Sequence, residues 1–473
     1  MSRDPRTSLA LAAVALAMLT GCAMRKPDLA MPAAFEAPPA PPAGALALDT
    51  WWTAFEDPEL TGLIEQALVR NPDIRTARSR LTEVRAQGAS NLLRYTPQGD
   101  ATVQKRRTET EQLSGTLANI PGFSTSGTSE QASANFNVSW EVDSVIRGIM
   151  VFGAAKAEAD RGRFGYEAAR ASVAAQVADA WFQAKGLAIQ LADARETLRV
   201  QQSLYDVAAK RAQLGLAAST EPDRIAGDLA QANSQVAALN AALQIQKRSI
   251  LILAGRNVEP TASITAAPMV GRIPPIPASL PGDLLTRRPD IRQAQAGVRS
   301  AIAQRRLAIA AFFPTVMLTP GIGWQKIDQP SFSSETQNWS IGGSVTQPVL
   351  SVPRLIADLK AQSARTEQAI TTYEKTVQTA FQESEAALVN LDADHQRVTL
   401  LTDGEVRARR AFEASRTGYQ RGLIDLNTTL SAEQSWRATR AQLTSAQVQA
   451  LRRSVQAYKA IGGGWPAQAY AAK

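Results

Sequence analysis

The chain repeats one of its own segments at a fixed distance. The stretch NPDIR at 71–75 returns as RPDIR at 288–292, and the two prolines lie 217 residues apart (289 minus 72). After each, a helix-like run ends at another proline 25 residues later, Pro97 (97 minus 72) in one copy and Pro314 (314 minus 289) in the other. A constant offset over this span indicates an internal duplication, whose period is far longer than that of a solenoid repeat. We therefore predict that the repeat unit is half of the molecule.

Charge, cysteine and histidine exclude several classes of protein. The 51 basic and 43 acidic residues give a net charge of +8, and the densest basic run is Lys105–Arg107. Nucleic-acid binding requires a concentrated basic face, so we expect no nucleic-acid partner. With one Cys and one His among 473 residues, a disulfide within the chain is impossible and a Cys/His metal site is hard to build. We expect no metal and no cofactor.

The first 22 residues have the pattern of a secreted lipoprotein. A basic start precedes an apolar run, Leu9–Leu19, which is too short to span a bilayer and is typical of a secretory signal. The sequence LTGC that follows resembles the lipobox of bacterial lipoproteins, which implies a signal peptide over 1–21 and a covalent lipid on Cys22. A plain signal peptide with an incidental cysteine is the alternative. Ala23 stands where an Asp would resemble an inner-membrane retention signal, so the resemblance implies the outer membrane.

Composition divides the remaining chain into five stretches. The Pro/Ala-rich stretch after Cys22 favours extended polyproline conformation and cannot bury a core, so it is predicted to tether the lipid anchor to the folded body. The predicted divisions are the tether 22–47, a first repeat 48–258, a Pro-rich link 259–281, a second repeat 282–460 and a tail 461–473.

Two stretches are predicted to form very long helices, Val151–Leu214 and Arg354–Thr417. Both are rich in Ala, Gln, Glu, Arg and Leu and contain almost no Gly or Pro, a composition that favours helix. Each ends at a Gly-Leu pair, Gly215-Leu216 and Gly422-Leu423, and glycine is common just past a helix end. A second helical stretch follows each pair, so each half is predicted to contain one helical hairpin.

Short runs of alternating polarity lie between the repeated proline segments and the long helices. They are Phe136–Asp143, Thr315–Gln325 and Trp339–Gln347, together with a weaker and more charged run at Ala101–Arg107. In these runs apolar and polar residues alternate, so that one face of the run is polar. This pattern fits a half-buried strand of a soluble protein or a strand of a membrane barrel. Tryptophans near the strand ends favour the membrane, where aromatic residues lie at the interface.

Each half therefore supplies two strands, which are joined by predicted surface loops at Thr108–Glu130 and Ile327–Gln337. Four strands cannot close a barrel, and open edges are not tolerated in lipid, so the chain is expected to oligomerise. Three copies would supply twelve strands, enough for an even-stranded closed barrel that a tube of helices continues.

Several segments resemble the outer-membrane efflux proteins, in particular the lipoprotein components of tripartite resistance-nodulation-division pumps. The most specific is IPPIPASLPGDLLTRRPDIRQAQAGVRSAIAQRRLAIAAFFPTVML (Ile273–Leu318), and WWTAFEDPELTGLIEQALVRNPDI and VSWEVD add to it. The resemblance covers almost the whole chain from Cys22. It implies an internally duplicated α+β membrane protein: a trimeric twelve-stranded outer-membrane β-barrel, continued by a long periplasmic α-helical barrel with a mixed equatorial domain.

Three positions depart from the family pattern. The strand VSWEVD is followed by SVIRG, which keeps Arg147 but lacks the family's aromatic-Gly pair. The second long helix is preceded by SVPR, which keeps Arg354 but lacks the family's Asp-Gly-Gly. Ser431 stands where some relatives carry an Asp in a constricting ring, so no carboxylate ring is carried over.

The resemblance implies a passive outer-membrane exit duct that exports drugs or other small toxic compounds from the periplasm or the cell. Its implied partners are two further copies of the chain, a periplasmic adaptor protein, an inner-membrane resistance-nodulation-division pump and outer-membrane lipid. We expect no enzyme activity, because His395 lies in a helical run without a Cys or Ser/Asp partner and the GGG at 462–464 has the pattern of a helix stop.

Two sets of site residues are predicted near the hairpin ends. Gly215, Leu216, Gly422 and Leu423 are expected to dock the adaptor, although a simple helix cap explains the glycines equally well. The charged residues near the turns are predicted to hold a constriction shut through ion pairs between partly desolvated groups. The alternative is that they are ordinary surface charges that contribute little. The gate candidates are Asp223, Arg224, Arg416, Tyr419, Arg421 and Asp425.

Two other functions remain open from the sequence. A non-conducting periplasmic coiled-coil lipoprotein would explain the long helices and Cys22, but it would not explain four alternating strands. The same duct could instead export metal ions or a polypeptide.

Overall fold

The computed structural model describes residues 27, 29, 31–36, 48–111, 127–142, 144–216, 218–277, 281–329 and 332–464. Cys22, the signal peptide 1–21, most of the tether and the end of the tail lie outside the described residues. The folded chain divides into two compact units, and each takes segments from both halves of the sequence. The first contains 82–161 and 295–372, and the second contains 28–81, 162–294 and 373–473.

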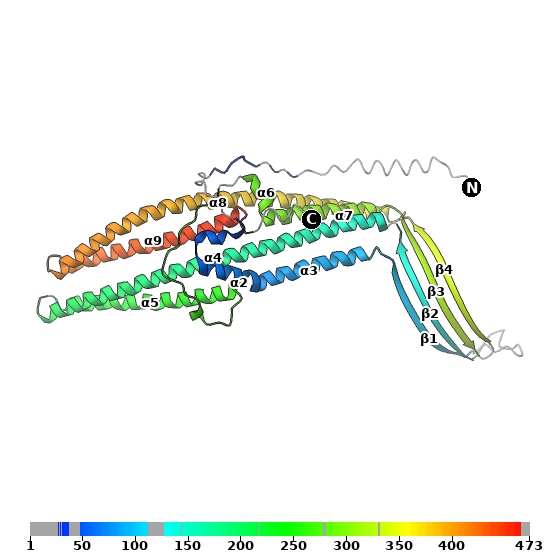
Figure 1. Cartoon of the computed structure of the whole chain (residues 1–473), viewed down its shortest axis with the longest axis horizontal. Helices are drawn as coiled ribbons and strands as arrows, with labels where there is room; N and C mark the ends of the chain where they lie inside the picture. Colours follow the sequence, from blue (N-terminus) through cyan, green and yellow to red (C-terminus); the bar gives the residue numbers. More distant parts are fainter. Residues whose placement is uncertain are drawn as a thin grey trace. The chain divides into compact units, whose positions relative to one another are not determined.

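The first unit contains a four-stranded antiparallel sheet in the order β1-β2-β3-β4 (Figure 1). Its strands are β1 (Gln98–Thr110), β2 (Gly127–Glu141), β3 (Thr315–Gln329) and β4 (Phe332–Thr346). The strands of each half pair with each other, and β2 pairs with β3 across the two halves. Within this chain, β1 and β4 are therefore the two edges of the sheet.

The sheet has one apolar face and one polar face, as the alternation predicted. Phe136 pairs with Ile322, and Ile322 pairs with Trp339, so one row across three strands is entirely apolar. All three of these side chains are exposed. The neighbouring row on the other face contains Asn135, Gly323 and Asn338. The exposed apolar face of this sheet has no cover within the chain's described residues.

Two loop predictions are wrong because the strands are longer than expected. Ile327–Gln337 was expected to be a loop, but β3 and β4 occupy it up to Gln329 and again from Phe332. The predicted loop Thr108–Glu130 is also too long, since β1 and β2 extend into both of its ends. Ser, Thr and Gly occur in loops and equally on the polar face of a paired strand. Cross-strand contacts decide between these alternatives. Trp324 on β3 donates from Nε1 to Oε1 of Glu335, a residue inside the supposed loop, at 2.7 Å.

The helices of the first unit are parts of longer helices. It contains the C-terminal parts of α3 (Pro72–Leu93) and α7 (Pro289–Ala310) and the N-terminal parts of α4 (Ser144–Gln213) and α8 (Val352–Gln420). The long helices predicted from composition are confirmed, with earlier starts than expected. Although the family glycines are missing, Ser144–Arg147 form the first turn of α4 and α8 begins at Val352 within SVPR.

The second unit contains the two helical hairpins. In the first hairpin α4 continues into α5 (Thr220–Leu253), and in the second α8 continues into α9 (Leu426–Ala460). The shorter elements are η1 (Leu48–Phe55), α2 (Pro58–Arg70), η3 (Thr261–Ser263), η4 (Pro281–Asp283) and α6 (Leu284–Arg287). Within the described ranges, every helix lacks the length of uncharged apolar sequence that a membrane crossing requires.

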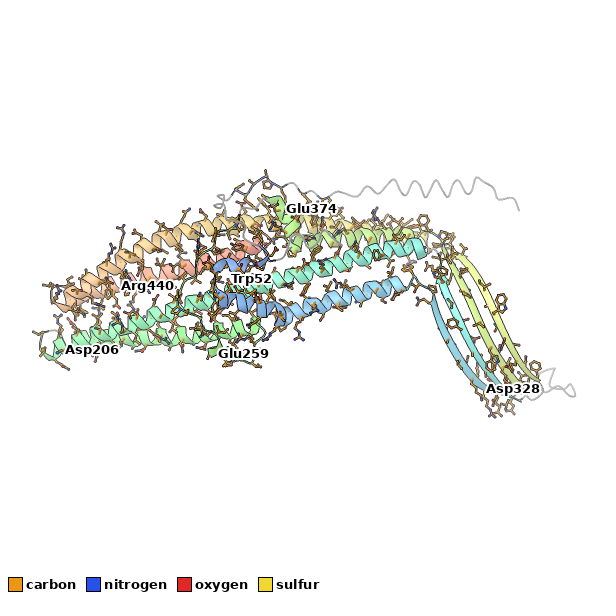
Figure 2. All side chains as sticks on the ribbon, viewed as in Figure 1. Trp52, Asp206, Glu259, Asp328, Glu374 and Arg440 are labelled. Atoms are coloured by element: carbon orange, nitrogen blue, oxygen red, sulfur yellow. The ribbon has the colours of Figure 1, made fainter. Side chains whose placement is uncertain are left out.

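An aromatic core holds the second unit together. Trp51 stacks on Tyr458 with ring centroids 5.8 Å apart, and Phe55 packs on Phe182 at 4.9 Å. Trp52, labelled in Figure 2, is buried beside them. Burying aromatic rings stabilises a fold strongly because each removes a large apolar area from water. This core packs η1 against α4 and α9.

Candidate gate and docking surface at the hairpin ends

Both hairpin ends have the same backbone geometry. Gly215 has a φ of 72°, its N–H donates to the Ala212 carbonyl at 3.0 Å, and the Leu216 N–H donates to the Arg211 carbonyl at 2.9 Å. The corresponding bonds at the other end join Gly422 to Tyr419 at 3.0 Å and Leu423 to Gly418 at 2.8 Å. This pattern satisfies the last carbonyls of a helix and requires glycine at the left-handed position.

The two leucines after these glycines point into solvent. Leu216 and Leu423 are both largely exposed, although helix ends usually bury the apolar residue at this position. The glycines therefore act as helix caps, and exposed leucine side chains mark both turns. Their role in docking an adaptor stays a prediction.

Asp425 and Arg224 make local contacts near the second turn. Asp425 begins α9 as its N-cap, accepting from the Thr428 N–H at 2.9 Å and the Thr428 hydroxyl at 2.6 Å. These hydrogen bonds from Thr428 lower the pKa of the Asp425 carboxyl. Arg224 on α5 donates from Nη1 to Asn427 Oδ1 on α9. Of the gate candidates, Arg224 thus joins the two hairpins directly.

Tyr419 is buried, whereas the other candidates are not. It lies in an apolar cluster between the hairpins with Leu204, Ile225 and Phe412. The Arg211 guanidinium carbon lies 5.1 Å from the centre of its ring, a distance at which a cation is attracted to an aromatic face. Burial raises the pKa of the Tyr419 hydroxyl, and the Glu221 carboxylate adds to this. Arg416 is half-buried, and its guanidinium carbon lies 6.0 Å from the centre of the Phe412 ring. Asp223 and Arg421 are exposed.

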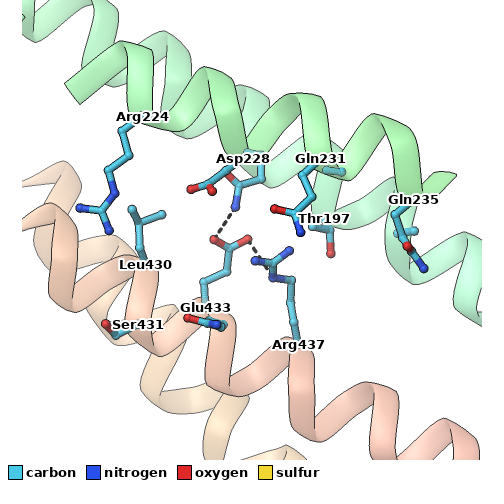
Figure 3. Close-up of a pocket in the computed structure, with 13 residues that line it drawn as sticks. Thr197, Arg224, Asp228, Gln231, Gln235, Leu430, Ser431, Glu433 and Arg437 are labelled. Atoms are coloured by element: carbon cyan, nitrogen blue, oxygen red, sulfur yellow. Dashed lines mark hydrogen bonds and ion pairs between the residues drawn. The ribbon is translucent and has the colours of Figure 1, made fainter. Parts of the chain in front are cut away.

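A buried carboxylate that the sequence did not predict lies between the hairpins. Glu433 on α9 and Gln201 on α4 are each 1% exposed, and Gln201 donates from Nε2 to Glu433 Oε2 at 2.8 Å. The Arg437 Nε atom lies 3.7 Å from Glu433 Oε1, and this contact is dashed in Figure 3. Burial raises the pKa of Glu433, Arg437 and the Gln201 hydrogen bond oppose this, and Asp228 adds to the rise. A buried charge with incomplete hydrogen bonding is costly.

A polar cavity of about 440 Å³ opens beside Glu433. Figure 3 shows it between α5 and α9, with Arg224, Asp228 and Gln231 on one side and Ser431, Glu433 and Arg437 on the other. Ser431 is exposed at its edge. Charges of both signs face this cavity, so the hairpins meet here through polar groups and not through an apolar seam.

Two further polar contacts join α4 to α9. Arg440 donates from Nε to Asp193 Oδ1 at 2.7 Å, and burial raises the pKa of Asp193 while Arg440 opposes the rise. Arg452 makes a two-pronged contact with Asp179 at 2.6 Å and 3.0 Å. We call these two pairs and the Gln201–Glu433 pair the cross-hairpin contacts. They hold the first hairpin against the second along α4 and α9.

The sequence contained a signal for Glu433 that the pattern analysis missed. Leu426, Leu430 and Glu433 follow at steps of four and three, so they share one face of α9. A glutamate on an apolar stripe predicts a buried, partnered charge. Its partner Gln201 lies 232 residues earlier, and only the tertiary structure identifies it. His395 is exposed on α8, and within the described part of the chain no three His, Cys, Asp or Glu side chains are grouped as metal ligands.

Known proteins share both the sequence pattern and the fold. A family model described as outer membrane efflux protein matches residues 63–256 and 280–463, more than half of the chain. The cation efflux system protein CusC of Escherichia coli O6:H1 is 29% identical over 431 residues, covering 88% of each chain. The pyoverdine export outer membrane protein OpmQ of Pseudomonas putida is 29% identical over 446 residues, covering 93% of each.

A solved structure agrees with the same assignment at the level of fold. The open state of the MtrE outer membrane channel of Neisseria gonorrhoeae superposes with a TM-score of 0.81 at 23% identity, covering 94% of this chain and 98% of that one. The resemblance read from the sequence is therefore confirmed. The chain belongs to the outer membrane efflux protein family, and it is a component of an efflux channel and not an enzyme.

Proposed function

We propose that three copies of this chain form a passive exit duct of a tripartite efflux system in the outer membrane. The single observation that carries the proposal is the sheet of the first unit, which exposes Phe136, Ile322 and Trp339 on one face and amides and hydroxyls on the other. A sheet with these two faces fits a wall between lipid and water. It has no use in a coiled-coil scaffold.

The number of strands supports an oligomer. One chain supplies four strands with two unpaired edges, and a strand edge in lipid leaves backbone groups without hydrogen bonds. Three copies would close a twelve-stranded barrel and would bring six helical hairpins together. A lipid on Cys22 would hold each copy at the membrane during this assembly.

The cross-hairpin contacts support a closed resting state at the hairpin ends. Opening would separate the first hairpin from the second and expose Gln201, Glu433 and their neighbours to water. We propose that an adaptor docks at Leu216 and Leu423 and favours this separation. An inner-membrane resistance-nodulation-division pump would supply the energy.

The proposed cargo is a set of drugs or other small toxic compounds. Relatives of similar identity carry different names, since CusC is named for cations and OpmQ for pyoverdine. A probable efflux pump outer membrane protein, TtgC of Pseudomonas putida, is 27% identical. Metal export is the second candidate, and its support is the match to CusC.

Accumulation of a panel of dyes, antibiotics and metal ions in a deletion strain, with and without the restored gene, tests the proposal. Organic compounds that build up and are cleared on restoration would support drug export, and clearance of metal ions alone would replace that cargo. If nothing changes, conductance of the purified protein in planar bilayers decides. A protein that passes no current would be a scaffold.

A further inference from the structure

An open apolar groove of about 480 Å³ lies in the first unit, where α3 and α4 meet the sheet. Leu92 and Tyr95 line it from the end of α3, and Ile149 and Phe152 line it from α4. Ile149 is 71% exposed and Phe152 is 56% exposed. Exposed apolar side chains gathered in this way mark a site for an apolar ligand or a membrane. We call this feature the α3–α4 groove.

The α3–α4 groove continues the apolar face of the sheet. Trp140 of β2 also lines it. Trp140 shares a face of the strand with the exposed Phe136, because side chains an even number of residues apart point the same way. The chain belongs to an outer membrane family, and the proposed function places this face of the sheet against lipid. The apolar ligand that the groove meets is therefore the acyl chain of a membrane lipid.

Two cations follow the groove where α3 and α4 touch. A Cβ added at Gly88 would lie 3.2 Å from the Cβ of Ala155, so the helices are in close contact there. Arg85 lies one turn before Gly88 on the same face of α3, and Lys156 lies one turn after Phe152 on the same face of α4. Both cations are exposed. Each helix therefore contributes one positive charge beside the end of the groove that lies away from the sheet.

The carboxylates closest in sequence to these two cations have other partners. Glu83 accepts a hydrogen bond from Gln87 Nε2 at 3.1 Å. Glu158 lies 3.2 Å from Arg161 Nη1. The charges of Arg85 and Lys156 are therefore available to an anionic group of a ligand.

The second half of the chain does not repeat this pair of cations. Lys156 corresponds to Ser363, 207 residues later (363 minus 156), which is the offset of the two capping glycines. Arg85 corresponds to Ile302, 217 residues later (302 minus 85), which is the offset of the repeated prolines. Ser363 accepts instead from Arg305 Nε at 3.1 Å, within the chain. The exposed cations are therefore specific to the first half and are not required by the duplicated helix packing.

We propose that the α3–α4 groove binds a phospholipid of the outer membrane, with an acyl chain along Ile149 and Phe152 and the headgroup phosphate on Arg85 and Lys156. A phosphate accepts strong, charge-assisted hydrogen bonds from such cations, and basic groups beside helices at a membrane bind lipid headgroups. The lipid predicted on Cys22 is joined through sulfur and carries no phosphate, so the cations favour a free phospholipid. The inference rests on the proposed lipid-facing side of the sheet and names a ligand that conduction itself does not require.

Native mass spectrometry of the full-length protein in detergent tests the phosphate contact, with added phosphatidylglycerol as the probe. Arg85→Ala with Lys156→Ala is expected to raise the Kd for this lipid by about tenfold or more, because charged hydrogen bonds are lost. Arg306→Ala with Lys360→Ala is the matched control, since it removes one exposed cation from each of α7 and α8, and it is expected to leave the Kd unchanged. An unchanged Kd in the first double variant would overturn the phosphate contact.

A second variant tests the position of the acyl chain while keeping both cations. Gly148 lines the groove, and a Cβ there has no described atom within 4 Å. Gly148→Phe is therefore expected to fill the groove and to weaken lipid binding, while the helical circular dichroism stays unchanged. Gly153→Phe adds the same ring to α4 at another open position, and it is expected to bind the lipid normally. Equal Kd values for the two variants would overturn the position of the acyl chain.

Two further measurements separate this site from the anchor and from the duct. If phosphatidylglycerol binds to Cys22→Ser and not to the unmodified protein, the chain's own lipid fills the groove and the phospholipid site is overturned. Equal binding to both supports the site. Bilayer conductance of the same preparations tests the duct: a protein that conducts but binds no phosphatidylglycerol would lose the lipid site alone. A protein that binds this lipid but passes no current would keep the site and lose the duct.

Discussion

Arg288 donates a hydrogen bond from Nη1 to the carbonyl oxygen of Ala460, the last residue of α9, at 3.1 Å. The first half has the same relationship between different residues. Asn71 donates from Nδ2 to the carbonyl oxygen of Leu253, the last residue of α5, at 2.9 Å. Both donors directly precede the proline of the repeated motif. The motif therefore occurs twice because each copy ties the end of the returning helix of its own half to the start of the proline-led helix of that half.

Arg288→Ala is expected to destabilise the second unit more than Asn71→Ala. The Arg288 guanidinium also contacts Asp290 at 2.6 Å and Glu383 at 2.7 Å, so its removal takes a charged donor from two carboxylates and leaves the Ala460 carbonyl with the Ser384 hydroxyl alone, at 3.0 Å. We expect a loss of about 2–3 kcal/mol, against about 1 kcal/mol for Asn71→Ala. Thermal melting of the helical circular dichroism of both purified variants measures the difference. Equal melting temperatures would contradict the ranking.

Gly255→Ala and Gly215→Ala separate two costs that usually occur together. Both glycines have a left-handed φ, 71° and 72°, so alanine is strained by about 1–2 kcal/mol at either position. A Cβ at Gly255 would also lie 2.7 Å from Arg70 Cβ and 2.9 Å from the Arg70 carbonyl oxygen, whereas one at Gly215 meets nothing. We expect the melting temperature to fall further for Gly255→Ala. An equal or larger fall for Gly215→Ala would contradict the added packing cost at Gly255.

Local sequence predicted the elements well and their lengths poorly. The two long helices followed from stretches without Gly or Pro, and their ends followed from Gly215 and Gly422. The strands were underestimated because Thr336 and Asn338 are equally suited to a loop. Pairing with β3 decides their conformation, and pairing depends on residues that are distant in the sequence.

The site was harder to predict than the fold. Asp425 was predicted to be a gate residue because it is a charge near the turn. Asp before a helical run is a common N-cap, and in the structure Asp425 is the N-cap of α9. Glu433 and Gln201 form a buried pair that no local pattern specifies. A contact between α4 and α9 requires the packing of two hairpins, which the sequence of either hairpin alone does not determine.

The raised pKa of Glu433 predicts that pH controls the separation of the hairpins. The carboxyl holds its proton more tightly when packed than in water, so the packed arrangement is favoured at low pH. This preference is fully present below the ordinary value of 4.5 and is lost as pH rises through the raised value. We expect the channel to open more often at neutral than at acidic pH. Single-channel recording between about pH 4 and pH 8 measures this, across the usual range of carboxyl titration.

Glu433→Gln is expected to remove that pH dependence and to keep the hairpins packed at neutral pH. The amide has the shape of the protonated carboxyl but cannot ionise. Asp403→Asn neutralises an exposed carboxylate of α8 that contacts Arg407, and it is expected to retain the pH dependence of the unmodified protein. A pH response that survives in Glu433→Gln would assign it to another group.

Leu216→Asp with Leu423→Asp is expected to abolish export without changing the protein's stability. Both side chains are exposed at the hairpin ends. The free energy of unfolding should therefore stay within about 0.5 kcal/mol of the value for the unmodified protein. A charge in a contact that an adaptor must desolvate would cost far more. Cells restored with this variant should therefore accumulate the same compounds as the deletion strain, while its bilayer conductance stays normal. Val258→Asp places the same charge on an exposed apolar position outside the turns and should restore export fully. If the double variant restores export as well as Val258→Asp does, the two leucines are helix-end residues without a docking role.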